Sequence, residues 1–233
     1  MIRLAVIGAG DWGEKHVRVY KELEAVEDDV VLEKICDTDS VKLEQVSSKY
    51  KVSSTNKVED ILLNSRIDAV SVVTPNTTHF DIASKLILSG KDVLVEKPMT
   101  MNSNSTRRLV DLAAKHKRIL MVGHVFRYHP SVKEAKRMIR EDALGSLYLL
   151  YGTRQDFRQP RLDSGATWNL SIHEMDMFCD LLGVDFPEAV SAYLGALLTP
   201  EVDGISIICM MFKDGVLGHA FETWLSPALR KVR

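Results

Sequence analysis

The glycine-rich stretch near the start of the chain, LAVIGAGDWG at residues 4–13, constrains the fold more than any other. An apolar run, which predicts a buried strand over residues 2–7, leads directly into Gly8, Gly10 and Gly13, and a helical pattern follows from about Asp11. In this spacing the first glycine permits a tight turn, the second lets a pyrophosphate approach the backbone, and the third lets the helix pack against the strand. The helix would also point its N-terminal amides at the phosphates. We expect a dinucleotide to bind at Gly8, Gly10, Asp11, Trp12 and Gly13; a turn that serves packing alone is the alternative.

A carboxylate at the end of the next predicted strand favours the dinucleotide interpretation. The run VVLEKICDTD, residues 30–39, reaches Asp37, which is placed to bond the hydroxyls of the adenosine ribose. Asp39 adds a second negative charge, and no arginine follows Asp37 directly. Because these charges would repel a 2′-phosphate, we expect NAD as the cofactor in preference to NADP.

Strand and helix patterns alternate along the first half of the chain, which predicts a doubly wound parallel sheet with helices on both faces. After the first strand and helix, strands are expected at 30–37, 52–55, 67–75, 92–98 and 118–126, and helices at 40–50, 57–64, 80–88 and 104–117. Asn102 or Ser103 is expected to cap the last of these helices. We expect a Rossmann α/β domain over residues 1–122.

The pattern changes after Pro130, and the second half predicts an α+β domain over 123–233 with a mostly antiparallel sheet. Helices are expected at 131–141 and 170–183, an irregular loop at 157–169, and strands at 145–155, 188–197, 204–212 and 216–224. Lys213-Asp214-Gly215 is a hairpin signal between the last two strands. The end of the chain, SPALRKVR, resembles entry into a further strand.

Composition excludes several classes of function. The formal net charge is −2, so no broad basic field indicates a nucleic acid or membrane partner. No apolar run is long enough to cross a bilayer, and no signal peptide precedes the first strand. The three cysteines form no CxxC or Cys/His cluster, so we expect no metal site. Reduced thiols predict a cytoplasmic protein.

Three further stretches, VVTPNTTH at 72–79, VLVEKPMT at 93–100 and SIHEMD at 171–176, stand at matching distances from the glycine turn. Together they resemble the glucose–fructose oxidoreductase / inositol dehydrogenase family (Gfo/Idh/MocA) over the whole chain. The resemblance implies an NAD-dependent dehydrogenase acting on a secondary alcohol of a sugar or cyclitol. It also implies a longer second domain than this chain carries, so we expect the second sheet to be incomplete. We expect copies of the chain to associate through that sheet.

The resemblance also assigns residues to the cofactor. Thr74, Pro75 and Asn76, with His79 nearby, would run along it at the carboxyl end of a parallel strand, where open α/β sheets bind ligands. Glu96 would lie near the nicotinamide ribose, beside Lys97 and Pro98, whose peptide bond is expected to be cis. Lys97 would reach both nicotinamide and substrate. A lysine at a buried strand end is costly unless it is paired, so Glu96 or a ligand should compensate its charge.

His173 is the expected general base, because a neutral imidazole can take a hydroxyl proton as the hydride leaves. A helix histidine satisfied by its neighbours is the alternative. The family usually has Asp four residues earlier, where this chain has Asn169. An asparagine can accept a hydrogen bond and orient the ring, but it cannot stabilise an imidazolium as a carboxylate does. Asp176 either supplies that charge or is an ordinary helix residue.

Arginines near these motifs indicate an anionic substrate. Arg127, in GHVFRYHP at the domain junction, would contact cofactor or substrate, or form a structural salt bridge. Arg154, Arg158 and Arg161 precede His173 in what we expect to be a loop, and arginine binds phosphate bidentately. A solvated charged loop is the alternative.

SIHEMD is most similar to the family branch that oxidises the 3-hydroxyl of nucleotide-activated N-acetylhexosamines. The expected substrate is therefore a nucleotide sugar such as UDP-N-acetylglucosamine, oxidised at C3. An inositol or free-sugar dehydrogenase is the first alternative. The second is a dinucleotide-binding regulator without catalysis, which Asn169 and the short second domain motivate.

Overall fold

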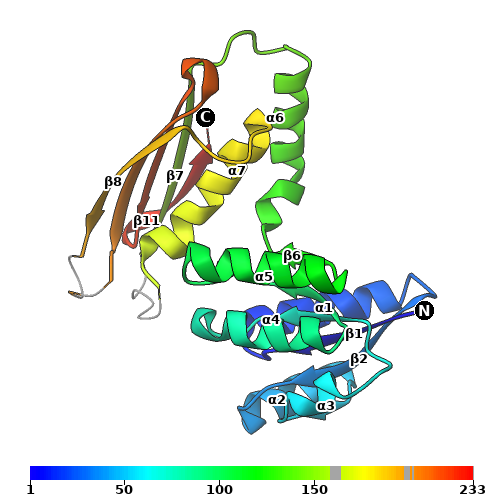
Figure 1. Ribbon diagram of the computed structural model, residues 1–233. Coiled ribbons are helices and arrows are strands. Elements are labelled where there is room, and N and C mark those ends of the chain that lie inside the picture. The colour runs from blue at the N-terminus through cyan, green and yellow to red at the C-terminus, as the bar shows by residue number, and fades with distance from the viewer. Residues whose placement is uncertain (158–163, 197–199, 201, 233) are drawn as a thin grey trace. The chain divides into compact units, whose positions relative to one another are not determined.

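The computed structural model describes residues 1–157, 164–196, 200 and 202–232. The chain divides into two compact units, Met1–Gly123 and His124–Arg233 (Figure 1). The division falls one residue beyond the boundary expected from the sequence. Each unit has its own sheet and its own buried apolar core.

Unit 1 contains a six-stranded sheet in the order β3-β2-β1-β4-β5-β6, and all of its neighbouring strands run parallel. Its central strands are short apolar runs, as strands buried on both faces require. The order reverses direction between β1 and β4, which is where open α/β sheets place their ligands. The strands are β1 (Ile2–Ile7), β2 (Val30–Cys36), β3 (Ser54–Thr55), β4 (Ala69–Val72), β5 (Asp92–Val95) and β6 (Leu120–Val122).

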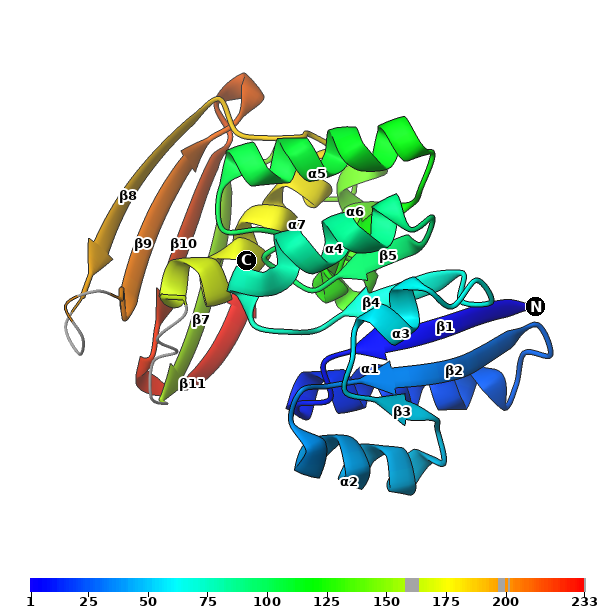
Figure 2. The same ribbon diagram turned by 60° about the horizontal axis from the view of Figure 1, so that its bottom comes forward.

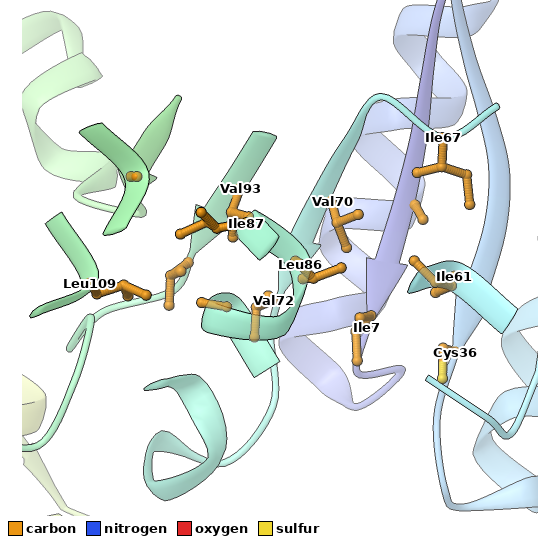
Figure 3. Packing of buried hydrophobic residues seen from close by; sticks show 14 residues of the cluster. Ile7, Cys36, Ile61, Ile67, Val70, Val72, Leu86, Ile87, Val93 and Leu109 are labelled. Carbon is orange, nitrogen blue, oxygen red and sulfur yellow. The ribbon is translucent and has the colours of Figure 1, made fainter. Parts of the chain in front are cut away.

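Helices cover both faces of this sheet, and Figure 2 shows α2 and α3 on opposite faces of β1, β2 and β3. One core joins the sheet to α3, α4 and α5 (Figure 3), and the other joins it to α1 and α2. Asp39 caps α2, and Asn102 caps α5 as the sequence predicted. The helices are α1 (Asp11–Glu24), α2 (Ser40–Tyr50), α3 (Glu59–Leu62), the 3₁₀ turn η1 (Asn76–Thr78), α4 (His79–Leu88) and α5 (Ser103–His116).

Unit 2 contains a five-stranded sheet in the order β11-β7-β10-β9-β8. Only the β7–β10 pair is parallel, so the predicted mostly antiparallel sheet is confirmed. The hairpin predicted at Lys213-Asp214-Gly215 joins β9 to β10. The strands are β7 (Leu149–Phe157), β8 (Ala189–Gly195), β9 (Ile205–Met211), β10 (Leu217–Thr223) and β11 (Leu225–Val232).

Helix α7 (Ile172–Leu182) packs on one face of this sheet, and α6 (Pro130–Arg140) packs on α7 (Figure 1). A 3₁₀ turn, η2 (Val125–Tyr128), precedes α6. Two expectations from the sequence were wrong here. The predicted irregular region does not begin at 157, because β7 continues through Phe157, and residues Thr167–Ser171 form a π-helix that leads into α7. Residues 158–163 of the predicted loop lie outside the described residues.

Among the described residues, no helix is both long and apolar enough to span a membrane. The same residues contain no group of three or more His, Cys, Asp or Glu side chains arranged to hold a metal ion.

Candidate functional site

The glycine turn lies between β1 and α1. Gly8 has a φ of +104°, and a Cβ on it would collide with the backbone of Val73. A Cβ on Gly13 would collide with the backbone of Gly8, so α1 can approach β1 only if residue 13 is glycine. A Cβ on Gly10, by contrast, would meet nothing within 4 Å. The first and third glycines therefore close the turn, whereas the second keeps its surface open, as a phosphate-binding turn requires.

Asp37 lies beside this turn, immediately after β2. Its carboxylate accepts hydrogen bonds from the backbone amides of Ala9, at 2.5 Å, and Asp39, at 2.8 Å. The carboxylate is thereby fixed to the turn at the carboxyl end of β2. A hollow of about 270 Å³ opens there, lined by Ala9, Gly10, Asp11, Glu14, Lys42, Gln45, Val46 and Lys49. The Asp39 side chain is used as the cap of α2.

The segment after β4 is held by its own side chains. Thr74 Oγ1 and Thr78 Oγ1 lie 2.7 Å apart, and Thr78 Oγ1 donates to the carbonyl of Pro75. Asn76 is buried. The fully buried His79 ring contacts the Pro98 carbonyl through Nδ1, at 2.8 Å, and the Thr74 carbonyl through Nε2, at 2.9 Å. This position suits a brace between the two loops better than the predicted direct contact with a cofactor.

Glu96 is buried at the end of β5, and its carboxylate faces α1. It accepts hydrogen bonds from His16 Nε2, at 3.0 Å, from the Trp12 side chain and from the Lys97 amide. Burial alone would raise the pKa of Glu96, but these bonds and the nearby His16 bring it below its ordinary value. A Cβ at Gly123 would lie 2.6 Å from Glu96 Oε1, so glycine there leaves room for the carboxylate.

Lys97 follows Glu96 and is half-buried. The Lys97–Pro98 peptide bond is cis, as expected. The residues at the carboxyl ends of β1, β2, β4 and β5 therefore gather at one edge of the unit 1 sheet, which is the edge that the sequence predicted for the cofactor.

In unit 2, His173 lies in the first turn of α7 and is buried. The ring of Phe126, from η2, meets the His173 ring edge to face, with centroids 4.8 Å apart and planes at 77°. Asn169 lies in the π-helix rather than in a regular helical turn before His173, and its Nδ2 donates to the carbonyl and the hydroxyl of Ser164.

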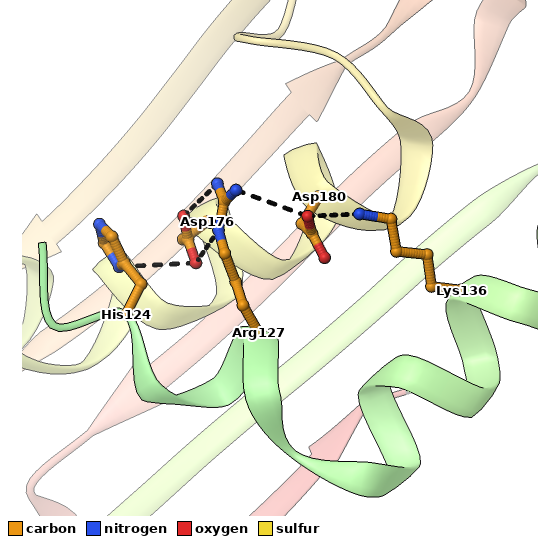
Figure 4. A network of polar contacts seen from close by, with 5 residues as sticks. All are labelled: His124, Arg127, Lys136, Asp176 and Asp180. Atoms are coloured by element: carbon orange, nitrogen blue, oxygen red, sulfur yellow. Dashed lines mark hydrogen bonds and ion pairs between the residues drawn. The ribbon is translucent and has the colours of Figure 1, made fainter. Parts of the chain in front are cut away.

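A polar network connects the start of unit 2 to α7 (Figure 4). Arg127 Nε donates to both Asp176 oxygens, at 2.8 and 2.9 Å, and Nη1 lies 3.5 Å from Asp180 Oδ1. Lys136 Nζ also bonds Asp180, and His124 Nδ1 lies 3.5 Å from Asp176. The bonded Asp176 raises the pKa of Arg127. Of the two roles left open for Arg127, the structure shows the salt bridge, and contact with a ligand stays a prediction.

Arg154 lies on β7, within the strand predicted at 145–155 and not in the loop expected to carry the three arginines, and its side chain points into the unit. Arg154 Nη2 bonds Glu174 Oε1 at 2.8 Å, and the two side chains are only 6% and 1% exposed. A guanidinium buried in this way does not suit a substrate phosphate. The predicted phosphate ligands Arg158 and Arg161 lie outside the described residues.

Sequence reasoning missed several of these groups: His16, Phe126, Glu174 and Glu222. Spacing could have found two of them. His16 follows Gly13 by three residues, which is one turn of α1. Glu222 is in phase with Gly218 and Ala220 on β10, so strand alternation places its carboxyl on the covered face. Burial raises the pKa of Glu222 to about 8; the neighbouring Glu174 adds to the shift, and Ser171 and Arg154 oppose it.

Comparison with known proteins gives the family. Residues 2–124 match the model of an oxidoreductase family with an NAD-binding Rossmann fold, and residues 132–233 match the Gfo/Idh/MocA C-terminal domain. UDP-N-acetylglucosamine 3-dehydrogenase of Acidithiobacillus ferrooxidans is 29% identical over 94% of this chain and 66% of its own length. Myo-inositol 2-dehydrogenase of Thermotoga maritima is 26% identical over 93% of this chain and 67% of its own length.

A solved structure of UDP-N-acetylglucosamine 3-dehydrogenase from Acidithiobacillus ferrooxidans superimposes with a TM-score of 0.86. That comparison gives 26% identity and covers 100% of this chain and 73% of the other. This chain thus spans about two thirds of the length of the curated relatives named above. The expected fold, oxidoreductase family and NAD-type cofactor domain are confirmed: the chain belongs to the Gfo/Idh/MocA family of NAD-binding oxidoreductases.

Proposed function

We propose that this protein oxidises a secondary hydroxyl of a sugar with NAD. The observation that carries the proposal is the edge of the unit 1 sheet, where the glycine turn, the fixed carboxylate of Asp37 and the Glu96-Lys97-Pro98 segment meet. NAD, when bound, supplies the hydride acceptor. The open surface at Gly10 fits the pyrophosphate, and Asp37 fits the adenosine ribose. Glu96, held by His16 and Trp12, is the proposed partner of the nicotinamide ribose.

Two side chains have proposed roles in the chemistry. The Lys97 ammonium polarises the reacting oxygen, and His173 takes the hydroxyl proton as the hydride leaves. Asn169 keeps its proposed role of orienting the imidazole, and the Asp176 carboxylate is engaged by Arg127. In this chain no aspartate occupies the position four residues before His173.

The proposed substrate is a nucleotide sugar such as UDP-N-acetylglucosamine, oxidised at C3. Support comes from the 29% identity to a UDP-N-acetylglucosamine 3-dehydrogenase. An inositol or free-sugar dehydrogenase is the second candidate, and the similarity to a myo-inositol 2-dehydrogenase favours it. With Arg154 committed to Glu174, the proposed contacts to a diphosphate rest on Arg158, Arg161 and Arg127.

The decisive experiment measures NADH formation with UDP-N-acetylglucosamine, free sugars and inositols. We expect turnover with one class and a large loss of kcat in Lys97→Ala, while calorimetry shows that NAD still binds. Lys91→Ala is a poor control because Lys91 is buried and bonded to the Asn64 and Ile67 carbonyls. The exposed Lys117 is suitable, and Lys117→Ala should leave turnover unchanged. Unchanged turnover in Lys97→Ala would contradict the proposal that Lys97 polarises the reacting oxygen.

A dinucleotide-binding regulator remains the alternative outside catalysis, and Asn169 motivates it. NAD binding without turnover of any compound on the panel, unrestored by Asn169→Asp, would favour the regulator. Turnover by the native protein would exclude it. We also propose a cytoplasmic location, since Cys36 and Cys179 are buried free thiols, and association of copies through the unit 2 sheet.

A further inference from the structure

Four side chains of unit 2 form a continuous stack that ends at His173. Glu174 Oε1 accepts from Arg154 Nη2 at 2.8 Å and from Nε at 3.2 Å. The Arg154 guanidinium carbon lies 4.4 Å from the centre of the Phe126 ring. The Phe126 ring in turn contacts the His173 ring edge to face, with the ring centroids 4.8 Å apart. Each planar group in the stack is thus fixed by the next.

The buried Arg154–Glu174 ion pair is not by itself evidence of a role in stability. A buried ion pair is often no better for stability than apolar side chains of the same volume, because both charges lose their hydration. The fold nevertheless makes room for this pair. A Cβ on Gly152, which lies two residues before Arg154 on β7, would come within 2.7 Å of Glu174 Cγ. The close approach of α7 to β7 at Glu174 therefore depends on a glycine.

Side chains of η2 also tie this turn to α7. Phe126 contacts His173, and the next residue, Arg127, bonds Asp176 one helical turn further along α7. The π-helix Thr167–Ser171 ends immediately before this turn, and π-helical segments occur frequently at functional sites. Two consecutive side chains of η2 therefore contact the same face of α7, at His173 and at Asp176.

From this arrangement we infer that Glu174, Arg154 and Phe126 are positioning residues that hold the His173 imidazole in one orientation for proton transfer. The inference deepens the proposed function and rests on it. Arginine suits the middle position because its guanidinium is planar and can bond Glu174 while lying over the Phe126 ring. Glu174 neutralises the Arg154 cation that lies behind the imidazole.

The kinetic test compares Phe126→Leu with Phe126→Tyr, which keeps the ring. Phe126→Leu should lower kcat roughly tenfold to a hundredfold, as misplacement of a catalytic group by about 1 Å does. The KM for the sugar and the Kd for NAD should stay within about twofold, because this change leaves binding groups in place. Phe126→Tyr should recover most of kcat. The matched control is Tyr128→Leu in the same 3₁₀ turn, whose ring lies under Lys133 instead.

Arg154→Lys separates charge from shape, since it keeps the cation and removes the planar group. It should lower kcat as Phe126→Leu does. The double variant that combines Phe126→Leu with Arg154→Lys should have a kcat no lower than that of the more impaired single variant, because both changes interrupt one stack. The inference is overturned if Phe126→Leu leaves kcat unchanged, if Tyr128→Leu lowers kcat equally, or if the two losses add.

A second readout does not need activity. The imidazole C–H resonances of His173, followed by ¹H–¹³C NMR in the full chain, should move in Arg154→Lys, which leaves the Phe126 ring in place, but not in Tyr128→Leu. If the native protein shows no turnover and these resonances move as described, the stack stands and the proposed function fails. If turnover is present and the resonances of His173 stay in place, the stack is overturned while the proposed function survives.

Discussion

Asp37 is the residue that should decide between NAD and NADP. Its carboxylate is fixed beside the glycine turn by the Ala9 and Asp39 amides, so a 2′-phosphate there would face a charge that cannot swing away. Asp37→Ser should lower the ratio of the Kd for NADP to the Kd for NAD, both measured by calorimetry. Asp39→Ser is the comparison variant: serine still caps α2, and the Asp39 carboxylate is bonded to the Val41 and Lys42 amides, so removing its charge should change the ratio less than Asp37→Ser does. An unchanged ratio in Asp37→Ser would place the adenosine ribose elsewhere.

Glu222 should make the stability of unit 2 fall as pH rises from about 4.5 to about 8. The carboxyl is fully buried, with Oε2 bonded to Ser171 and Oε1 without a hydrogen-bond partner among the described residues. Its pKa is raised from 4.5 to about 8 in the folded protein. Because the folded state then binds more protons than the unfolded state, the contribution to stability is complete below about pH 4.5 and is lost as pH rises to about 8.

Glu222→Gln tests this, since an amide fits the same space and has no proton to lose. Thermal unfolding of the native protein and the variant should be compared at pH 6 and pH 9. The variant should gain stability relative to the native protein on going from pH 6 to pH 9, by an amount of a few kcal/mol at most. A difference between the two proteins that does not change with pH would contradict the burial of a neutral carboxyl at this position.

At the scale of elements, the turn between β1 and α1 separates a folding role from a binding role. Gly10 has ordinary extended backbone angles and open space around it, so Gly10→Ala should leave the melting temperature nearly unchanged. The new methyl group would occupy the approach of the pyrophosphate, and the Kd for NAD should rise roughly tenfold or more, the equivalent of about 1.4 kcal/mol. Gly13→Ala should instead lower the melting temperature, because the new Cβ would collide with the backbone of Gly8.

Elements with strong local signals were predicted closely. The first strand and the α2 helix have the bounds that the sequence indicated, because a glycine turn, a cap at Asp39 and a regular apolar period all agree there. The π-helix Thr167–Ser171 was not predicted, since a π-helix has no distinctive sequence period. For the candidate site, the sequence indicates residue types but not the contacts between them. The Glu96–His16 bond and the Arg154–Glu174 pair join residues far apart in sequence, and no local pattern specifies such pairs.

At the scale of the whole molecule, the outer face of the unit 2 sheet is the surface through which copies should associate. Alternation along the strands leaves one face uncovered by α6 and α7. Leu149, Leu217 and Met211 are neighbours across β7, β10 and β9 on that face and are 53%, 51% and 44% exposed. Rows of exposed apolar side chains on a sheet usually mark an interface.

Light scattering after gel filtration tests this association. The native protein should elute as a dimer or larger species, and Leu217→Lys should shift it toward the monomer, because a charge in the middle of the row cannot be buried without a partner. Leu63→Lys is the matched control, since Leu63 belongs to unit 1 and is 84% exposed. NAD binding should persist in both variants, because the glycine turn and Asp37 belong to unit 1. A native protein that stays monomeric at all concentrations, or equal dissociation by Leu63→Lys, would refute association through this face.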